Sequence, residues 1–141
     1  MSSTTAFTTA GKLAFLKGEI LAAHTFKYAL YTSTATNGAA TSVYSTTNEI
    51  TGTGYTAGGN TLSGYAATTS GTTAYLDWAD TSWTSASFTA ESGMVYDDTD
   101  TVGPKRAIAI MGFGGNQTVT AGTFTIQFPV ADATNAIVRL A

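Results

Sequence analysis

The side chains that could carry acid–base or nucleophilic chemistry are few. Histidine is the side-chain type that titrates near neutrality, and the sequence holds only His24. A Ser-His-Asp site would have to use it, but no Gly-x-Ser-x-Gly turn supplies a nucleophile. Because His24 stands between an expected helix and an expected strand, we expect it to help complete the helix C-terminus.

Carboxylates offer two further possibilities. Asp97, Asp98 and Asp100 precede a Gly-Pro turn and two basic residues, and alternating carboxylates in a loop can bind calcium. The twelve-residue calcium loop with its terminal Glu is missing, so a solvated hairpin connection with local charge pairing is the simpler interpretation. The sequence leaves open whether these three residues bind a cation.

Glycoside hydrolysis needs two acids that flank a sugar, and the sequence does not fix the separation of any pair. Asp77 alternates with apolar neighbours in an expected strand, which predicts that it faces solvent. The glycine-rich run 52–59 lacks the Lys of a phosphate loop and favours turns. The acids from which a pair could be drawn are Asp77, Asp80, Glu91 and Asp132.

Aromatic side chains could stack on sugar rings, anchor a protein interface or cover the ends of a β-sandwich. For Tyr75 and Trp78 regular strand alternation favours the covering role. The aromatic residues concerned are Tyr31, Tyr44, Tyr55, Tyr65, Tyr75, Trp78 and Trp83.

Composition excludes several classes. The chain has 141 residues, six Lys and Arg against nine Asp and Glu, and a net charge of −3, so we expect no nucleic-acid partner. With no Cys there is no thiol nucleophile, disulfide or Cys-type metal site. Residues 1–10 lack the pattern of a secretory signal, and the uncharged runs are rich in Thr and Ser, so we expect a soluble protein without a membrane span.

The elements that must position these groups are mostly strands. Apolar residues at helical spacing predict one helix within 9–22, and alternation predicts a strand at 26–31. Dense turn signals predict a long ordered loop over 32–65. Strand 106–113 is apolar or small on both faces, so it should be central and covered twice. The further expected strands are 73–78, 83–89, 93–96, 123–128 and 136–140, with turns marked by Ser92-Gly93, Gly114-Gly115-Asn116 and Ala121-Gly122.

These elements predict an all-β, single-domain antiparallel β-sandwich of about seven strands with a short N-terminal helix and a long ordered loop. The domain spans 1–141, with an N-terminal arm and short helix in 1–25. A loop as long as 32–65 in a compact domain is usually functional, so it is the expected docking loop.

Several segments together resemble small virion structural proteins of tailed bacteriophages, of the capsid decoration (cement) type. The likeness covers most of the chain, and its motifs are structural. It implies a non-enzymatic protein of the capsid surface, made in the host cytoplasm, that docks on the major capsid protein and forms a homotrimer. The segments are 26–32 (FKYALYT), 48–59 (NEITGTGYTAGG), 77–83, 90–97 (AESGMVYD), 107–113 and 122–129.

On this resemblance the N-terminal segment through Ile20 and loop 32–65 should dominate the capsid contacts. Where relatives carry a basic or small residue before the Gly-Met-Val-Tyr strand, this chain has Glu91-Ser92, so a contact there differs. No catalytic, cofactor-binding or metal-binding residue is assigned. The alternatives are a tail or fibre module that binds a host surface glycan, and a hydrolase.

Overall fold

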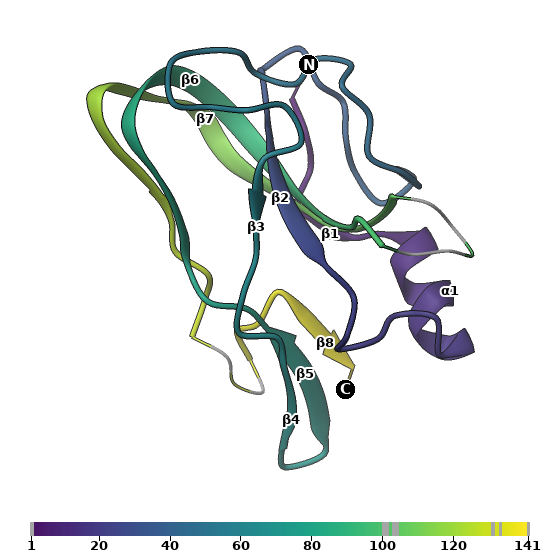
Figure 1. Cartoon of the computed structure of the whole chain (residues 1–141). Helices are drawn as coiled ribbons and strands as arrows, with labels where there is room; N and C mark the ends of the chain where they lie inside the picture. Colours follow the sequence, from purple (N-terminus) through teal and green to yellow (C-terminus); the bar gives the residue numbers. More distant parts are fainter. Residues whose placement is uncertain (1, 100–101, 103–104, 131, 133, 141) are drawn as a thin grey trace.

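The chain folds into two antiparallel sheets and one short helix (Figure 1). The computed structural model describes residues 2–99, 102, 105–130, 132 and 134–140. The large sheet has the strand order β1-β7-β6-β2-β3, and the small sheet has the order β4-β5-β8. The elements are β1 (Ala6–Phe7), α1 (Thr9–Lys17), β2 (Phe26–Tyr31), β3 (Asn60–Thr61), β4 (Ala66–Ser70), β5 (Thr73–Asp77), β6 (Thr81–Asp97), β7 (Arg106–Ile126) and β8 (Val138–Leu140).

The all-β class, the two antiparallel sheets and the short N-terminal helix are confirmed. Strands β2, β5 and β8 lie where alternation predicts them. The predicted breaks within β6 and β7 are wrong, because each of these strands runs through two expected ones. Gly93, Gly114, Gly115 and Gly122, which the sequence marks as turns, lie within these strands. They are positions of close packing or of bulges, which a strand accommodates without ending.

Short strands β1, β3 and β4 were not predicted. All five residues of β4 are exposed, so this strand shows no alternation of apolar and polar residues. Strand β3 falls within the predicted loop, where it pairs with β2. The rest of the predicted loop is irregular but ordered by isolated bridges to β2, β6 and β7.

Helix α1 is shorter than predicted and is oriented differently. It ends at Lys17 because Gly18 adopts a left-handed conformation (φ 71°) and its amide bonds back to the helix carbonyls. Two of the leucines whose helical spacing predicts this helix are exposed, Leu13 by 53% and Leu16 by 83%. The buried residues are instead Gly11 and Ala14.

The large sheet is covered on both faces. On one face, apolar side chains of β2, β6 and β7 pack with residues of the small sheet, including Leu76 and Val138. On the other face a second cluster joins Tyr31, Met94 and Tyr96 to Ala35 and Tyr44 of the long loop. The prediction that strand 106–113 is central is therefore confirmed, with Ile108 in the first cluster and Ile110 in the second.

The ring of Tyr28 in β2 lies against the backbone of the paired strand β6 at Gly93. A Cβ atom at Gly93 would lie 2.2 Å from ring atoms of Tyr28, which is itself fully buried. The hydroxyl of Tyr28 donates to Met111 Sδ at 3.6 Å, which holds the ring over Gly93.

We expect Gly93→Ala to destabilise the fold by about 1–3 kcal/mol through overpacking. Gly38→Ala is the control, since a Cβ there would meet its nearest atoms at 3.9 Å. That variant should stay within about 0.5 kcal/mol of the parent. Urea unfolding of the three proteins measures the difference, and equal midpoints would show that Tyr28 does not restrict this position.

Candidate interaction surface

The N-terminal arm and the long loop lie side by side and form one surface (Figure 1). The amide of Thr4 donates to the carbonyl of Asn37 at 2.9 Å, and the amide of Thr9 donates to that of Ala39 at 2.8 Å. The amide of Asn37 in turn donates to the hydroxyl of Ser3 at 3.2 Å. We call residues 2–21 together with residues 33–45 the arm–loop surface.

Helix α1 is held to β7 by its N-cap and by small residues. Thr8 Oγ1 accepts from the amide of Gly11 at 2.9 Å and donates to the carbonyl of Ala107 at 2.7 Å. Its own amide donates to the carbonyl of Ile108 at 2.9 Å. A Cβ at Gly11 would come within 3.1 Å of the Ile108 backbone, so the helix lies directly on the strand.

This close approach decides which residues of the helix face outward. Because Gly11 and Ala14 occupy the contact with β7, the larger Leu13 and Leu16 lie on the exposed side. Leu21, just beyond the helix, is also exposed by 50%. The arm–loop surface therefore presents leucines on a helix that is fixed in place.

The chain after the helix is fixed by ion pairs. Glu19 Oε2 accepts from Arg106 Nη1 at 2.5 Å, and the Lys17 ammonium lies 3.8 Å from Glu19 Oε1. Glu19 and Arg106 are both largely shielded from solvent, with 17% and 12% of their side chains exposed. This pair secures the C-terminal side of the helix to the start of β7.

The long loop is organised around the carboxylate of Glu49. Oε1 accepts from the hydroxyl of Tyr55 at 2.6 Å and from the amide of Gly58 at 2.7 Å, and Oε2 accepts from the hydroxyl of Tyr44 at 2.7 Å. The hydroxyl of Tyr55 also accepts from the amide of Leu30 in β2 at 3.0 Å. Sequence reasoning missed this role, although Glu49 is the single charged residue in 28–76.

A stacked aromatic pair joins the loop to the sheet. The rings of Tyr44 and Tyr96 lie 4.4 Å apart and 15° from parallel, and the Lys105 ammonium stands 5.7 Å from the centre of the Tyr44 ring. The hydroxyl of Tyr96 donates to the carbonyl of Gly58 at 2.7 Å. These contacts close the second apolar cluster.

The acidic turn pairs with local cations, as the simpler interpretation predicts. Asp98 accepts from Lys105 at 2.6 Å and lies 3.6 Å from the Lys27 ammonium, and the hydrogen bond with Lys105 lowers the pKa of Asp98. Asp97 is fully buried. Asp100 lies outside the described residues, and within those residues no group of three or more potential ligands could hold a metal ion.

The prediction for His24 is wrong. The helix ends at Gly18, so His24 is too far along the chain to complete its C-terminus. Its Nδ1 instead lies 2.5 Å from Oδ2 of the buried Asp97, whose other oxygen accepts from the amide of Thr99. His24 thus links the approach to β2 with the end of β6.

The four candidate acids have separate local roles. Asp80 accepts from the amide of Phe128 at 2.8 Å, and Asp132 accepts from the amides of Thr134 and Asn135 at 2.7 Å. The hydrogen bonds from these two backbone amides lower the pKa of the Asp132 carboxyl, and the bond from Asn135 has the larger effect. Glu91 lies in the groove described below.

Asp77 is half-buried rather than on the solvent face as predicted. Burial raises the pKa of its carboxyl, and the neighbouring charge of Asp80 raises it further. Within the described residues its Oδ1 has no hydrogen-bond partner. Neither Asp77 nor Asp80 lines the groove described below.

The aromatic side chains are mainly part of the core. Trp78 is 2% exposed, and its ring centre lies 5.3 Å from that of Phe26. Trp83 is 3% exposed, and its ring centre lies 6.0 Å from that of Tyr55. Tyr31 is 1% exposed, while Tyr65 and Tyr75 are half-buried. The covering role predicted for Trp78 fits this burial, and the rings do not form an exposed platform for sugars.

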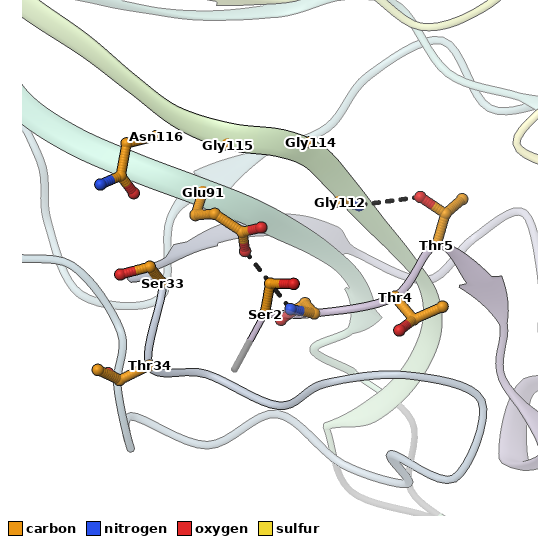
Figure 2. Close-up of a pocket in the computed structure, with 11 residues that line it drawn as sticks. Ser2, Thr4, Thr5, Ser33, Thr34, Glu91, Gly112, Gly114, Gly115 and Asn116 are labelled. Atoms are coloured by element: carbon orange, nitrogen blue, oxygen red, sulfur yellow. Dashed lines mark hydrogen bonds between the residues drawn. The ribbon is translucent and has the colours of Figure 1, made fainter.

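A polar groove of about 900 Å³ crosses the arm–loop surface (Figure 2). Its walls are residues 2–5 of the arm, Ser33 and Thr34 of the loop, and the β7 segment around Gly114 and Gly115. Glu91 of β6 also lines the groove and is 4% exposed. The groove is therefore rich in hydroxyl groups and contains one carboxylate.

No protein-family model, curated protein or solved structure matches this chain. Among the described residues no helix is long and apolar enough to cross a membrane. The interpretation of the surface therefore rests on the geometry and chemistry given above.

We expect Glu49→Ala to lower the free energy of unfolding by about 3 kcal/mol, because it leaves three donors without their charged acceptor. Hydrogen exchange at the Gly58 amide should accelerate, which urea unfolding alone would not reveal. Thr46→Ala, an exposed neighbour in the same loop, is the control and should change neither quantity. An unaltered exchange rate at Gly58 in Glu49→Ala would contradict the role of Glu49.

Stability should also fall in alkali. Burial raises the pKa of Tyr28, Tyr31 and Tyr55, and for Tyr55 the hydrogen bond to Glu49 adds to the effect. The folded chain therefore holds phenol protons that the unfolded chain releases above about pH 10, so the free energy of unfolding decreases as pH rises beyond that value. Phenolate absorbance should rise late and together with unfolding, whereas a full phenolate signal from the folded protein would exclude this linkage.

Proposed function

We propose that this chain is a non-enzymatic structural protein of a tailed-bacteriophage virion, a capsid decoration protein. In this role it docks on the outer surface of the major capsid protein shell and stabilises the head. The observation that supports the proposal best is the rigidly mounted helix α1, with Leu13 and Leu16 exposed beside the long loop. The sequence resemblance to such virion proteins supplies the identity of the partner.

Exposed leucines on a fixed helix are suited to docking. Burying a leucine side chain stabilises an interface by about 1.5–3 kcal/mol, and a rigid mount avoids the entropy loss of ordering the helix on binding. A standard interface buries roughly 800 Å² per partner, so the helix alone is too small and the neighbouring loop has to contribute. The arm–loop surface provides both segments side by side.

The proposal includes self-association as a homotrimer at a local three-fold position of the capsid. The alternative is a tail or fibre module that binds a host surface glycan. Glycan binding by stacking needs exposed aromatic rings, and the burial of Trp78 and Trp83 removes two of the candidates. The decoration role is therefore the one favoured.

Immunogold electron microscopy of intact particles with antibody to this chain tests the proposal. Label spread over the heads is the expected result, and label confined to the tail would favour the glycan-binding alternative. Leu13→Ser with Leu16→Ser should abolish rebinding to stripped particles, while Val130→Ser, which alters another exposed apolar residue, should not. Light scattering that gives only the 14.5 kDa monomer would contradict the trimer.

A further inference from the structure

We infer that the groove over Glu91 is a binding site for a primary ammonium group, namely a lysine side chain presented by a protein partner (Figure 2). The inference goes beyond the proposed function, because it concerns the chemistry of one site and holds for any protein that carries the lysine. Its test uses the isolated chain, so the result does not depend on where the protein resides.

The buried carboxylate of Glu91 has too few hydrogen-bond partners to offset its loss of contact with water. Its side chain is 4% exposed, and within the described residues its hydrogen-bond partner is the amide of Ser3, at the long distance of 3.4 Å. A buried carboxylate is unfavourable unless it is paired with a cation or with several strong donors. The site is therefore short of positive charge in the free chain.

An irregularity of the β6–β7 ribbon opens the space in front of this carboxylate. Ala90 pairs with Gln117 and Ser92 pairs with Gly112, so Glu91 alone stands opposite residues 113–116 of β7. Two of those four residues are Gly114 and Gly115, where an added Cβ would meet no atom within 4 Å. Because of this bulge Glu91 has no directly paired residue on β7, and the space beside its side chain is open. Bulges are frequent next to functional sites.

The remaining walls supply hydrogen-bond acceptors rather than cations. Ser2, Ser3, Thr4, Thr5, Ser33 and Thr34 place hydroxyl groups around the groove, and its lining contains no Lys or Arg. An ammonium group has three donors and no acceptor, so a carboxylate together with hydroxyl oxygens matches it. A charge-assisted bond to Glu91 would provide most of the affinity.

Other cations fit this site less well. Calcium takes six to eight oxygen ligands that usually include several carboxylates, and Glu91 is the single carboxylate of the groove lining. A guanidinium carries five donors in a rigid planar fork, whereas the three donors of a compact ammonium group can rotate to meet one carboxylate and the surrounding hydroxyl oxygens. A volume of about 900 Å³ exceeds an ammonium ion and accommodates a lysine side chain with its flanking backbone.

Nuclear magnetic resonance of the isotope-labelled full chain tests the inference, with acetyl-Gly-Lys-Gly-amide as the probe. At about 10 mM peptide, well above a millimolar dissociation constant, we expect shifts of the amides of Ser3, Gly112, Gly114 and Gly115. Glu91→Gln should weaken binding about tenfold or more, because a neutral amide replaces the charged acceptor. Asp132→Asn makes the same change of charge at an acid outside the groove and should bind like the parent.

Two further probes identify the source of the ammonium group and do not depend on any variant. The same peptide with an Nε-acetylated lysine keeps the length but loses the charge, and it should produce no shifts in the groove. Putrescine distinguishes a free amine from a peptide lysine, and binding of putrescine as tight as that of the peptide would overturn the assignment to a protein partner. Absence of groove shifts with the lysine peptide, or equal binding by Glu91→Gln, would overturn the site itself.

Discussion

Residues 107–110 of β7 and the facing parts of β2 and β6 are buried on both sides of the large sheet, and the rest of the structure follows from the need to cover both. The small sheet covers one face with Leu76 and Val138, and Trp78 follows directly after β5. The other face is covered mainly by a loop, which has no strand ladder to satisfy its backbone groups. Isolated bridges to the strands, the carboxylate of Glu49 and the hydroxyls of Tyr31 and Tyr96 supply those partners, so separate contacts hold an irregular segment over a hydrophobic surface.

A small number of contacts also holds helix α1 in place while its leucines stay exposed. Thr8 fixes the helix start to β7 by two backbone carbonyls, and Gly11 and Ala14 let the backbones approach closely. A helix that packs through its smallest residues has its larger ones left for another partner. The helix is thus attached to β7 through small residues and still presents an apolar face to solvent. In most amphipathic helices the leucines form the buried contact and are not available on the surface.

Sequence patterns predicted the features that depend on neighbours along the chain. Alternation located β2 and the doubly covered strand 106–113, because a strand buried on both faces is apolar throughout. Patterns failed where distant contacts decide. Gly93 signals a turn in the sequence, yet its role is to admit the ring of Tyr28. The leucine spacing of α1 predicts a buried face, but the contact with Ile108 selects the opposite one. Glu91 carries no local motif, since its partner Ser3 comes from a remote part of the chain. The partners of Glu49 are near in sequence, but they lie in an irregular loop that no periodic pattern describes.

The register of β1 has a consequence for the order in which the chain is completed during synthesis. Ala6 pairs with Ile110, and Thr8 bonds to Ala107 and Ile108, so the arm leaves the ribosome long before its partners on β7. Contacts of such large sequence separation form late, because the entropy of closing the intervening chain must be overcome first. The helix and the arm therefore stay undocked until β7 has emerged. A nascent or prematurely terminated chain that lacks β7 therefore cannot form the finished arm–loop surface.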